Sequence, residues 1–398
     1  MTTRLSSLAW VVLLATWIAS LQPAHAQTEF RPGRGVHFAS GDDQFSLDLW
    51  LRNQLRYTLD NEPAPGDRDL QHTIELRRAS VFMAGHAYGE HNKYFVQLIF
   101  SPRELGIGTD SFHSPLFDWF FTFDQLRDVS VHAGQFKPFY SRQFIAPWGG
   151  LQFVDRSIVE KEFLANRDIG LDIYSRDLFG LGLLRYDVGL FAGRGRDSFR
   201  RGPLHPSLMA RVEIMPLGFF EALQEGDLKR SGRPGLALGV AYKRDFRASR
   251  DRGVVGQTPS DGGTTDFHNL TADAVFKVAG FSAQAAVFYR DGDRHPGSAL
   301  DAESGMALPT ASPRDAVGAF AQVGQMFPGL PLEVAARLGR TSFRDGAGLP
   351  DQGELGGAIS YYLSDHNFKF QADYFHLWLD GELGDGADQV RVQLQSTL

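Results

Sequence analysis

The chain has 398 residues, no cysteine and a formal net charge of −7. Without cysteine it can form neither a disulfide framework nor a thiolate for nucleophilic or zinc chemistry. The acidic balance leaves no basic footprint for nucleic acid, so nucleic-acid binding is excluded as a class.

The N-terminus carries an export pattern. Arg4 precedes an apolar run of about 14 residues, Leu8–Leu21, which is shorter than the roughly 20 residues that a membrane-spanning helix needs. A small-x-small sequence follows at 24–26. These features predict a signal peptide over 1–26 that is cleaved before Gln27, with an uncleaved membrane anchor as the alternative.

The remaining residues, 27–398, alternate apolar and polar side chains with a period of two. Leu47, Leu49 and Leu51 alternate with Asp48 and Trp50, and the pattern recurs at 184–190, 208–214, 270–276, 332–338, 368–374 and 390–394. Residues two apart share one face of a strand but not of a helix. No later run of about 18 apolar residues exists, so membrane insertion would have to use strands. The 43 Gly and 32 Phe suit turns and strands respectively.

The links between these segments alternate in length. Short links fall at 89–92, 279–280, 328–331 and 365–367, and long links at 60–71, 102–115 and 247–264. The link at 216–234 is long where a short one is expected. We therefore predict an all-β fold, a transmembrane antiparallel β-barrel of about 16 strands with short periplasmic turns and long outer loops. Such a barrel belongs in the outer membrane of a Gram-negative bacterium.

The longest link, residues 138–166, is the candidate constriction loop. Loops of this length are uncommon unless they have a function. A loop at the outer mouth that folds into the lumen would narrow the pore and give it selectivity.

Several motifs carry a family resemblance. They are Glu75-Leu76-Arg77-Arg78-Ala79, Gly134-Gln135-Phe136-Lys137-Pro138-Phe139, Phe153-Val154-Asp155-Arg156-Ser157 and Asn166-Arg167-Asp168-Ile169-Gly170. In order and spacing they resemble the phosphate-selective porin O and P family, and the resemblance extends over nearly the whole of 27–398. The chain departs from the family pattern at Ala286-Val287, where many relatives carry an acidic residue, and at Leu398, where such barrels usually end in an aromatic residue.

The resemblance implies a sixteen-stranded outer-membrane porin, commonly a homotrimer, that passes phosphate or polyphosphate through a constriction lined by arginine and lysine. Its partners would be outer-membrane lipid, small anions such as phosphate and the barrel-assembly machinery, with no cofactor, no metal and no enzymatic activity. Two alternatives stay open: a general or other-solute porin on the same barrel, and a soluble periplasmic all-β binding protein.

Guanidinium groups suit phosphate because they stay charged and present fixed donors. The candidate substrate-binding or constriction residues are Lys137, Arg77, Arg78, Arg142, Arg156, Arg52 and Arg56. Further lumen-facing candidates are Arg167, Arg185, Arg211, Arg290 and Arg337. Each could instead be a wall charge paired with an acid such as Asp48, Asp187, Glu213 or Asp373. In a regular strand only one of Arg77 and Arg78 can face the lumen.

Aromatic residues offer a second kind of path. Stacked rings could guide a sugar, and the candidates are Trp119, Phe121, Phe123, Tyr374 and Trp378. The alternative is an interfacial girdle, which is the usual role of aromatic residues at both membrane surfaces.

Overall fold

The computed structural model describes residues 27–398 apart from 65, 108–112, 197–201, 345 and 382. The predicted signal peptide, 1–26, lies outside the described residues. Within the described part of the chain, no helix has the length and apolar character needed to cross a membrane.

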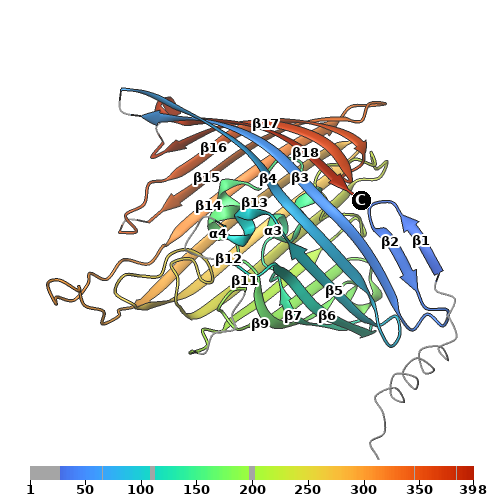
Figure 1. Ribbon diagram of the computed structural model, residues 1–398, viewed down its shortest axis with the longest axis horizontal. Coiled ribbons are helices and arrows are strands. Elements are labelled where there is room, and N and C mark those ends of the chain that lie inside the picture. Colours follow the sequence, from blue (N-terminus) through green and yellow to red (C-terminus); the bar gives the residue numbers. More distant parts are fainter. Residues whose placement is uncertain (1–26, 65, 108–112, 197–201, 345, 382) are drawn as a thin grey trace, which may run out of the picture.

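Sixteen of the described strands, β3 to β18, form one closed antiparallel barrel (Figure 1). Each strand pairs with the next, and β18 pairs with β3 to close the barrel. Beyond β18, Leu398 and Leu51 exchange two backbone hydrogen bonds of 2.9 Å. The strands are β3 (Ser46–Ala64), β4 (Asp67–His86), β5 (Asn92–Ile99), β6 (Leu116–Leu126), β7 (Val129–Phe136), β8 (Asp168–Ser175), β9 (Leu184–Phe191), β10 (Ser207–Ile214), β11 (Gly235–Ala248), β12 (Thr264–Val278), β13 (Phe281–His295), β14 (Ala316–Met326), β15 (Leu332–Phe343), β16 (Gln352–Ser364), β17 (Phe368–Leu379) and β18 (Ala387–Thr397). The predicted all-β barrel and its strand number are confirmed.

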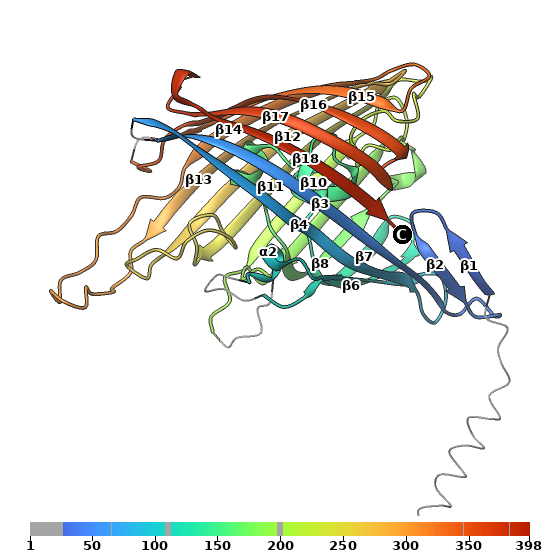
Figure 2. The ribbon, with the colours of Figure 1, turned by 45° about the horizontal axis from the view of Figure 1, so that its top comes forward.

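Two short strands precede the barrel. β1 (Gln27–Arg31) and β2 (Gly35–Ala39) form a hairpin, and β2 pairs with the start of β3. The hairpin lies beside the end of the barrel that carries the C-terminus (Figures 1 and 2). Its His37 Nδ1 lies 2.6 Å from a carboxylate oxygen of Asp48 at the rim.

The alternation seen in the sequence sorts side chains between lipid and lumen. On β10, Leu208, Val212 and Ile214 are exposed on the outer face, whereas Arg211 and Glu213 between them are buried inside. The apolar outer faces cost no free energy in contact with lipid, and closure leaves no strand edge with unpaired backbone groups.

Most of the links between strands are short or long as predicted, and one prediction is corrected. The predicted long link 60–71 is wrong, because β3 and β4 stay paired out to Ala64 and Asp67 and extend well beyond the other strands. Alternation stops there because both faces are polar, but the backbone pairing continues. The unexpected long link at 215–234 joins β10 to β11 at the short-turn end.

The short helices lie in the links. They are α2 (Pro102–Leu105), α3 (Arg142–Ile145), α4 (Ile158–Phe163), η1 (Trp148–Gly150), η2 (Leu178–Gly180) and η3 (Leu383–Asp385). Ser157 caps α4, because its hydroxyl oxygen accepts a 2.9 Å hydrogen bond from the Glu160 amide. Figure 1 shows α3 and α4 inside the barrel, so the link between β7 and β8 folds into the lumen.

Candidate functional site

Buried ion pairs hold the first half of the link between β7 and β8 (residues 137–167, called the lumen loop below) against the barrel wall. Arg142 donates from Nε to Asp273 on β12 at 2.7 Å and from Nη2 to Glu213 on β10 at 2.5 Å. Arg211 of β10 donates to the same Asp273 at 2.7 Å. All four side chains are buried. Because each arginine faces a carboxylate, their charges are largely compensated within the wall.

The second half of the lumen loop is held by strands farther around the barrel. The Val154 amide donates to Asp373 of β17 at 3.0 Å, and Arg56 of β3 donates to the Val154 carbonyl at 3.0 Å. Arg337 of β15 donates to the Asp155 carbonyl at 3.0 Å. The lumen loop therefore crosses the barrel and is fixed on several walls.

The long turn 215–234, called the inner turn below, meets the lumen loop from the other end of the barrel. The carboxylate of Glu225 accepts a 2.8 Å hydrogen bond from the Gln152 amide and a 3.0 Å bond from the Gln143 side chain. The Glu225 amide in turn donates to the Gly150 carbonyl at 2.8 Å. Lys369 of β17 donates to the Leu151 carbonyl at 2.7 Å. This side of the lumen is packed with protein.

Three adjoining cavities run along β3 to β8. The cavity at the long-loop end is about 440 Å³, the middle one about 200 Å³ and the one at the short-turn end about 720 Å³. Lys137, Trp148 and Arg167 line both of the first two cavities. Phe95, Phe120, His132 and Phe139 line both of the last two.

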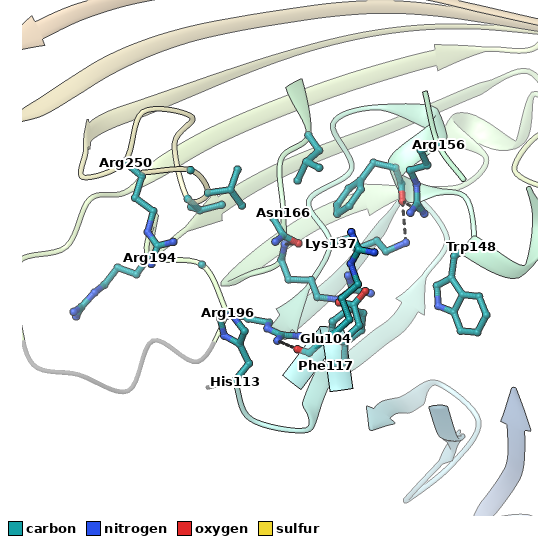
Figure 3. A pocket seen from close by; sticks show the side chains of 18 of the residues that line it. Glu104, His113, Phe117, Lys137, Trp148, Arg156, Asn166, Arg194, Arg196 and Arg250 are labelled. Carbon is teal, nitrogen blue, oxygen red and sulfur yellow. Dashed lines mark hydrogen bonds between the residues drawn. The ribbon is translucent and has the colours of Figure 1, made fainter. Parts of the chain in front are cut away.

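The cavity at the long-loop end, called the basic cavity below, is strongly cationic (Figure 3). Among the described residues that line it, eight are cationic and Glu104 alone carries a carboxylate. The eight are Arg78, Arg103, Lys137, Arg156, Arg167, Arg194, Arg196 and Arg250. In Figure 3, Arg194 and Arg250 lie on one side of the cavity and Lys137 and Arg156 on the other.

Backbone carbonyls of the lumen loop orient two of these cations. Lys137 Nζ donates to the Phe144 carbonyl at 2.8 Å, and Arg156 donates to the carbonyls of Gln143 at 2.8 Å and Ala146 at 2.9 Å. Carbonyls fix the position of a cation without cancelling its charge. Burial, reinforced by the neighbouring charge of Arg156, holds the pKa of Lys137 well below its usual range.

Both members of the Arg77-Arg78 pair point inward, which a regular strand would not allow. A β-bulge lets Gln54 pair with Arg78 and Leu55 with Leu76, so Arg77 is the extra residue. Arg77 donates to Glu104 at 2.8 Å, whereas Arg78 donates to the neutral side chain of Gln54 at 2.9 Å. Burial raises the pKa of Glu104, but Arg78 and Arg77 outweigh it and lower that pKa to about 2.

The structure thus divides the predicted site residues. Lys137, Arg78 and Arg156 line the basic cavity, and Arg52 lines the middle one. In the described part of the chain, none of these four forms an ion pair with a carboxylate. The other three are paired: Arg56 lies 3.4 Å from Asp155, and Arg77 and Arg142 bind the acids given above. These three therefore fit the role of a wall charge paired with an acid better than the role of a substrate-binding residue.

The remaining arginine candidates are also paired. Arg167 binds Asp118 at 2.8 Å through two of its nitrogens, Arg337 binds Glu354 at 3.1 Å, and Arg185 lies 3.4 Å from Glu213. Arg290 pairs with Glu162 of α4. Of this group, only Arg167 lines the basic cavity.

Four arginines of the basic cavity were missed by the sequence prediction: Arg103, Arg194, Arg196 and Arg250. They belong to three different outer links, where no strand alternation indicates the direction of a side chain. A usable signal was the clustering of arginine in Arg194-Gly195-Arg196 and Arg250-Asp251-Arg252.

Four of the five predicted sugar-path aromatics point outward, and Trp378 lines a further cavity of about 570 Å³ together with Ile158 of α4 and Leu377. Trp119, Phe121, Phe123 and Tyr374 are exposed on the outer face, as expected of an interfacial girdle. Trp378 is partly buried beside Gly353. The aromatic residues that line the middle cavity are different ones: Phe82, Phe95, Phe120, Phe136, Phe139 and Trp148. Among the described residues, no group of three or more His, Asp or Glu side chains is placed to hold a metal ion.

The fold and its apolar outer face define the class. The protein is a transmembrane β-barrel of the Gram-negative outer membrane. No protein-family model and no curated protein matches the sequence.

Solved structures match the fold at low sequence identity. An anion-selective porin from Comamonas acidovorans is 11% identical, with a TM-score of 0.57 over 89% of this chain and 100% of its own. OprB of Pseudomonas putida is 11% identical, with a TM-score of 0.57 over 90% and 95%. The outer-membrane channel DcaP of Acinetobacter baumannii is 13% identical, with a TM-score of 0.53 over 91% and 99%. The chain therefore has the fold of the porin barrels.

Proposed function

We propose that the protein is an outer-membrane porin that lets small anions diffuse passively through the basic cavity. The observation that carries this proposal is the unequal charge of the described residues that line that cavity: eight are cationic and one is a carboxylate. Passage is governed by the local field at the narrow part of a pore rather than by net charge. An overall charge of −7 is therefore compatible with anion preference.

Phosphate or polyphosphate is the finer form of the proposal. Arg78 and Arg156 bring planar guanidinium groups that no carboxylate pairs in the described chain, and such groups bind phosphate oxygens with two parallel hydrogen bonds. We also propose a homotrimer, because the structural neighbours include a trimer form of OmpT, an outer-membrane protein of Vibrio cholerae.

A general porin is the second candidate. The cavity at the short-turn end is lined by both signs of charge, with Arg31, Arg34 and Lys93 facing Asp43 and Asp124 among others. A pore whose selectivity were set there would pass both cations and anions.

The test is the reversal potential of the purified protein in planar bilayers under a KCl gradient, followed by titration of the chloride current with phosphate. We expect a potential that shows chloride preference. Block by low phosphate would support the phosphate form, whereas anion preference without block would leave a porin for other anions. A potential near zero or of cation sign would overturn the proposed anion preference.

A further inference from the structure

The middle cavity differs in chemistry from both of its neighbours. Eight of its fourteen lining residues are apolar, and six of these are aromatic. They are Phe82, Phe95, Phe120, Phe136, Phe139 and Trp148. The lumen of a transmembrane barrel is ordinarily polar, so an aromatic lining at this depth calls for an explanation.

The rings form a continuous series across neighbouring strands. The Phe95 ring centroid lies 6.2 Å from that of Phe82 and 5.2 Å from that of Phe120, which is stacked on it. His132 continues the series, with centroids 5.0 Å from Phe120 and 5.7 Å from Phe139. Phe95, Phe120 and Phe139 are only partly buried, so part of each ring faces open space.

A glycine on β7 lets the backbones of β6 and β7 approach closely beside Phe120. Gly134 pairs with Phe120 across the β6–β7 ladder and has a φ of 144°. A Cβ at this position would lie 2.2 Å from the Trp119 carbonyl oxygen and 2.9 Å from the Phe120 Cβ. The two strands thus approach closely beside Phe120, which a side chain at position 134 would prevent.

Cations stand at the entrance to this aromatic cavity. Lys137 lines it together with the basic cavity, and the guanidinium of Arg52 lies 5.6 Å from the Phe82 ring and 5.3 Å from the Trp148 ring. An anionic group held at Lys137 would place an attached apolar body next to Phe95 and Phe120.

Inorganic phosphate would find no partner among these rings. An ion that leaves water needs polar groups to replace its hydration, and aromatic faces do not supply them to an anion. A flat apolar body would instead gain contact area and ring stacking. The cavity is of a suitable size, since a cavity of roughly 150 Å³ can hold benzene and this one measures about 200 Å³.

We propose that the path selects organic anions with a flat apolar body, aromatic carboxylates as a class, over inorganic phosphate. The carboxylate is drawn in by the basic cavity, and its ring passes along Phe95, Phe120 and Phe139. This inference rests on the proposed anion porin, names its substrate class, and replaces the phosphate form of that proposal.

The test compares permeabilities of sodium benzoate, acetate and phosphate from bi-ionic reversal potentials of the full-length exported protein in planar bilayers. Benzoate is larger than acetate and would be slower in a plain aqueous pore. We expect benzoate to be the most permeant of the three. A benzoate-to-acetate ratio below one in the wild type would overturn the inference.

Variants of the rings give the second readout. Phe120→Ala and Phe95→Ala should each lower the benzoate-to-acetate ratio roughly two- to tenfold, the range expected for one lost stacking contact. Phe121→Ala is the matched control, because it lies next on β6 and points outward. If Phe120→Ala fails to fold, Phe120→Leu takes its place. It keeps most of the side-chain bulk but removes the aromatic ring, so it should lower the benzoate-to-acetate ratio in the same way. Ratios that stay at the wild-type value in both folded ring variants would overturn the inference.

The KCl reversal potential of the same membranes separates this inference from the proposed function. Cation preference in KCl would mean that the anion porin itself is wrong. Chloride preference combined with poor benzoate permeation would refute the substrate class and leave the anion porin standing.

Discussion

Arg142 on the lumen loop and Asp273 on β12 lie 2.7 Å apart in a buried ion pair, although 131 residues separate them in sequence. Arg142 also reaches Glu213 on β10, so one side chain ties the lumen loop to two strands of the wall. The position of the lumen loop, and with it the course of the open path, depends on this contact.

Removing that contact should loosen the lumen loop. Arg142→Ala leaves a buried excess of negative charge around Asp273 and Glu213, which should destabilise the barrel by about 3 kcal/mol. Single-channel recordings should show a larger conductance and more current noise. Arg340→Ala is the control, because Arg340 forms an exposed ion pair with Asp351 that contributes little to stability. A quiet channel of wild-type conductance would show that Arg142 does not hold the lumen loop.

Charge reversal at the basic cavity should change ion preference in steps. Replacing Lys137 by Gln and then by Glu changes the local charge by one and then two units. Each unit is worth about 1 kcal/mol for an ion at contact distance, or roughly fivefold in the ratio of chloride to potassium permeability. The reversal potential should move toward cation preference in that order, and Arg156→Glu should act likewise. Arg340→Glu supplies the same charge change away from the path. Equal shifts in that control would mean that the cavity does not set the preference.

Anion preference should fall with rising pH at a pH below the ordinary pKa of lysine, about 10. Lys137 is charged below its pKa, and burial and Arg156 hold that pKa below its usual range. Its positive charge is therefore lost on the alkaline side, earlier than for an exposed lysine. Lys137→Arg should keep its preference over the same range because arginine stays protonated. A parallel decline in that variant would assign the effect to another group.

The contact between the inner turn and the lumen loop should be needed for stability. Glu225→Ala removes the acceptor for the Gln152 amide and the Gln143 side chain, both in a buried setting. Buried donors left without partners should cost about 2 kcal/mol or more. On denaturing gels, the band of the folded barrel should convert to the band of the unfolded chain at a lower temperature for this variant than for the wild type. Glu221→Ala, in an exposed part of the same turn, should behave as the wild type.

Strand alternation was enough to predict the barrel, because one face of every strand meets lipid and the other meets polar lumen. It failed at 60–71, where β3 and β4 stay paired above the apolar band and both faces are polar. The long link at 216–234 stood out as an exception in the sequence, but its docking on Gly150 and Gln152 depends on contacts between distant segments.

The candidate site was only partly predictable. Arginine and lysine in matching motifs pointed to Lys137, Arg78 and Arg156, which line the basic cavity. The sequence could not separate these from Arg142 and Arg56, because the distant acids that pair with them, Asp273 among them, come near only through the fold. The inward direction of both Arg77 and Arg78 depends on a bulge, which is set by the register of two strands.

The central claim is that anions cross along β3 to β8, past Lys137. Because the chain has no cysteine, Lys137→Cys would carry the only thiol in the protein. Its modification by an anionic and a cationic thiol reagent can be followed as loss of conductance in planar bilayers. Gln322→Cys, buried where the lumen loop packs on β14, is the matched control. We expect fast block at position 137, faster with the anionic reagent, and no block at 322. Block at 322 but not at 137, or faster reaction with the cationic reagent, would contradict the account.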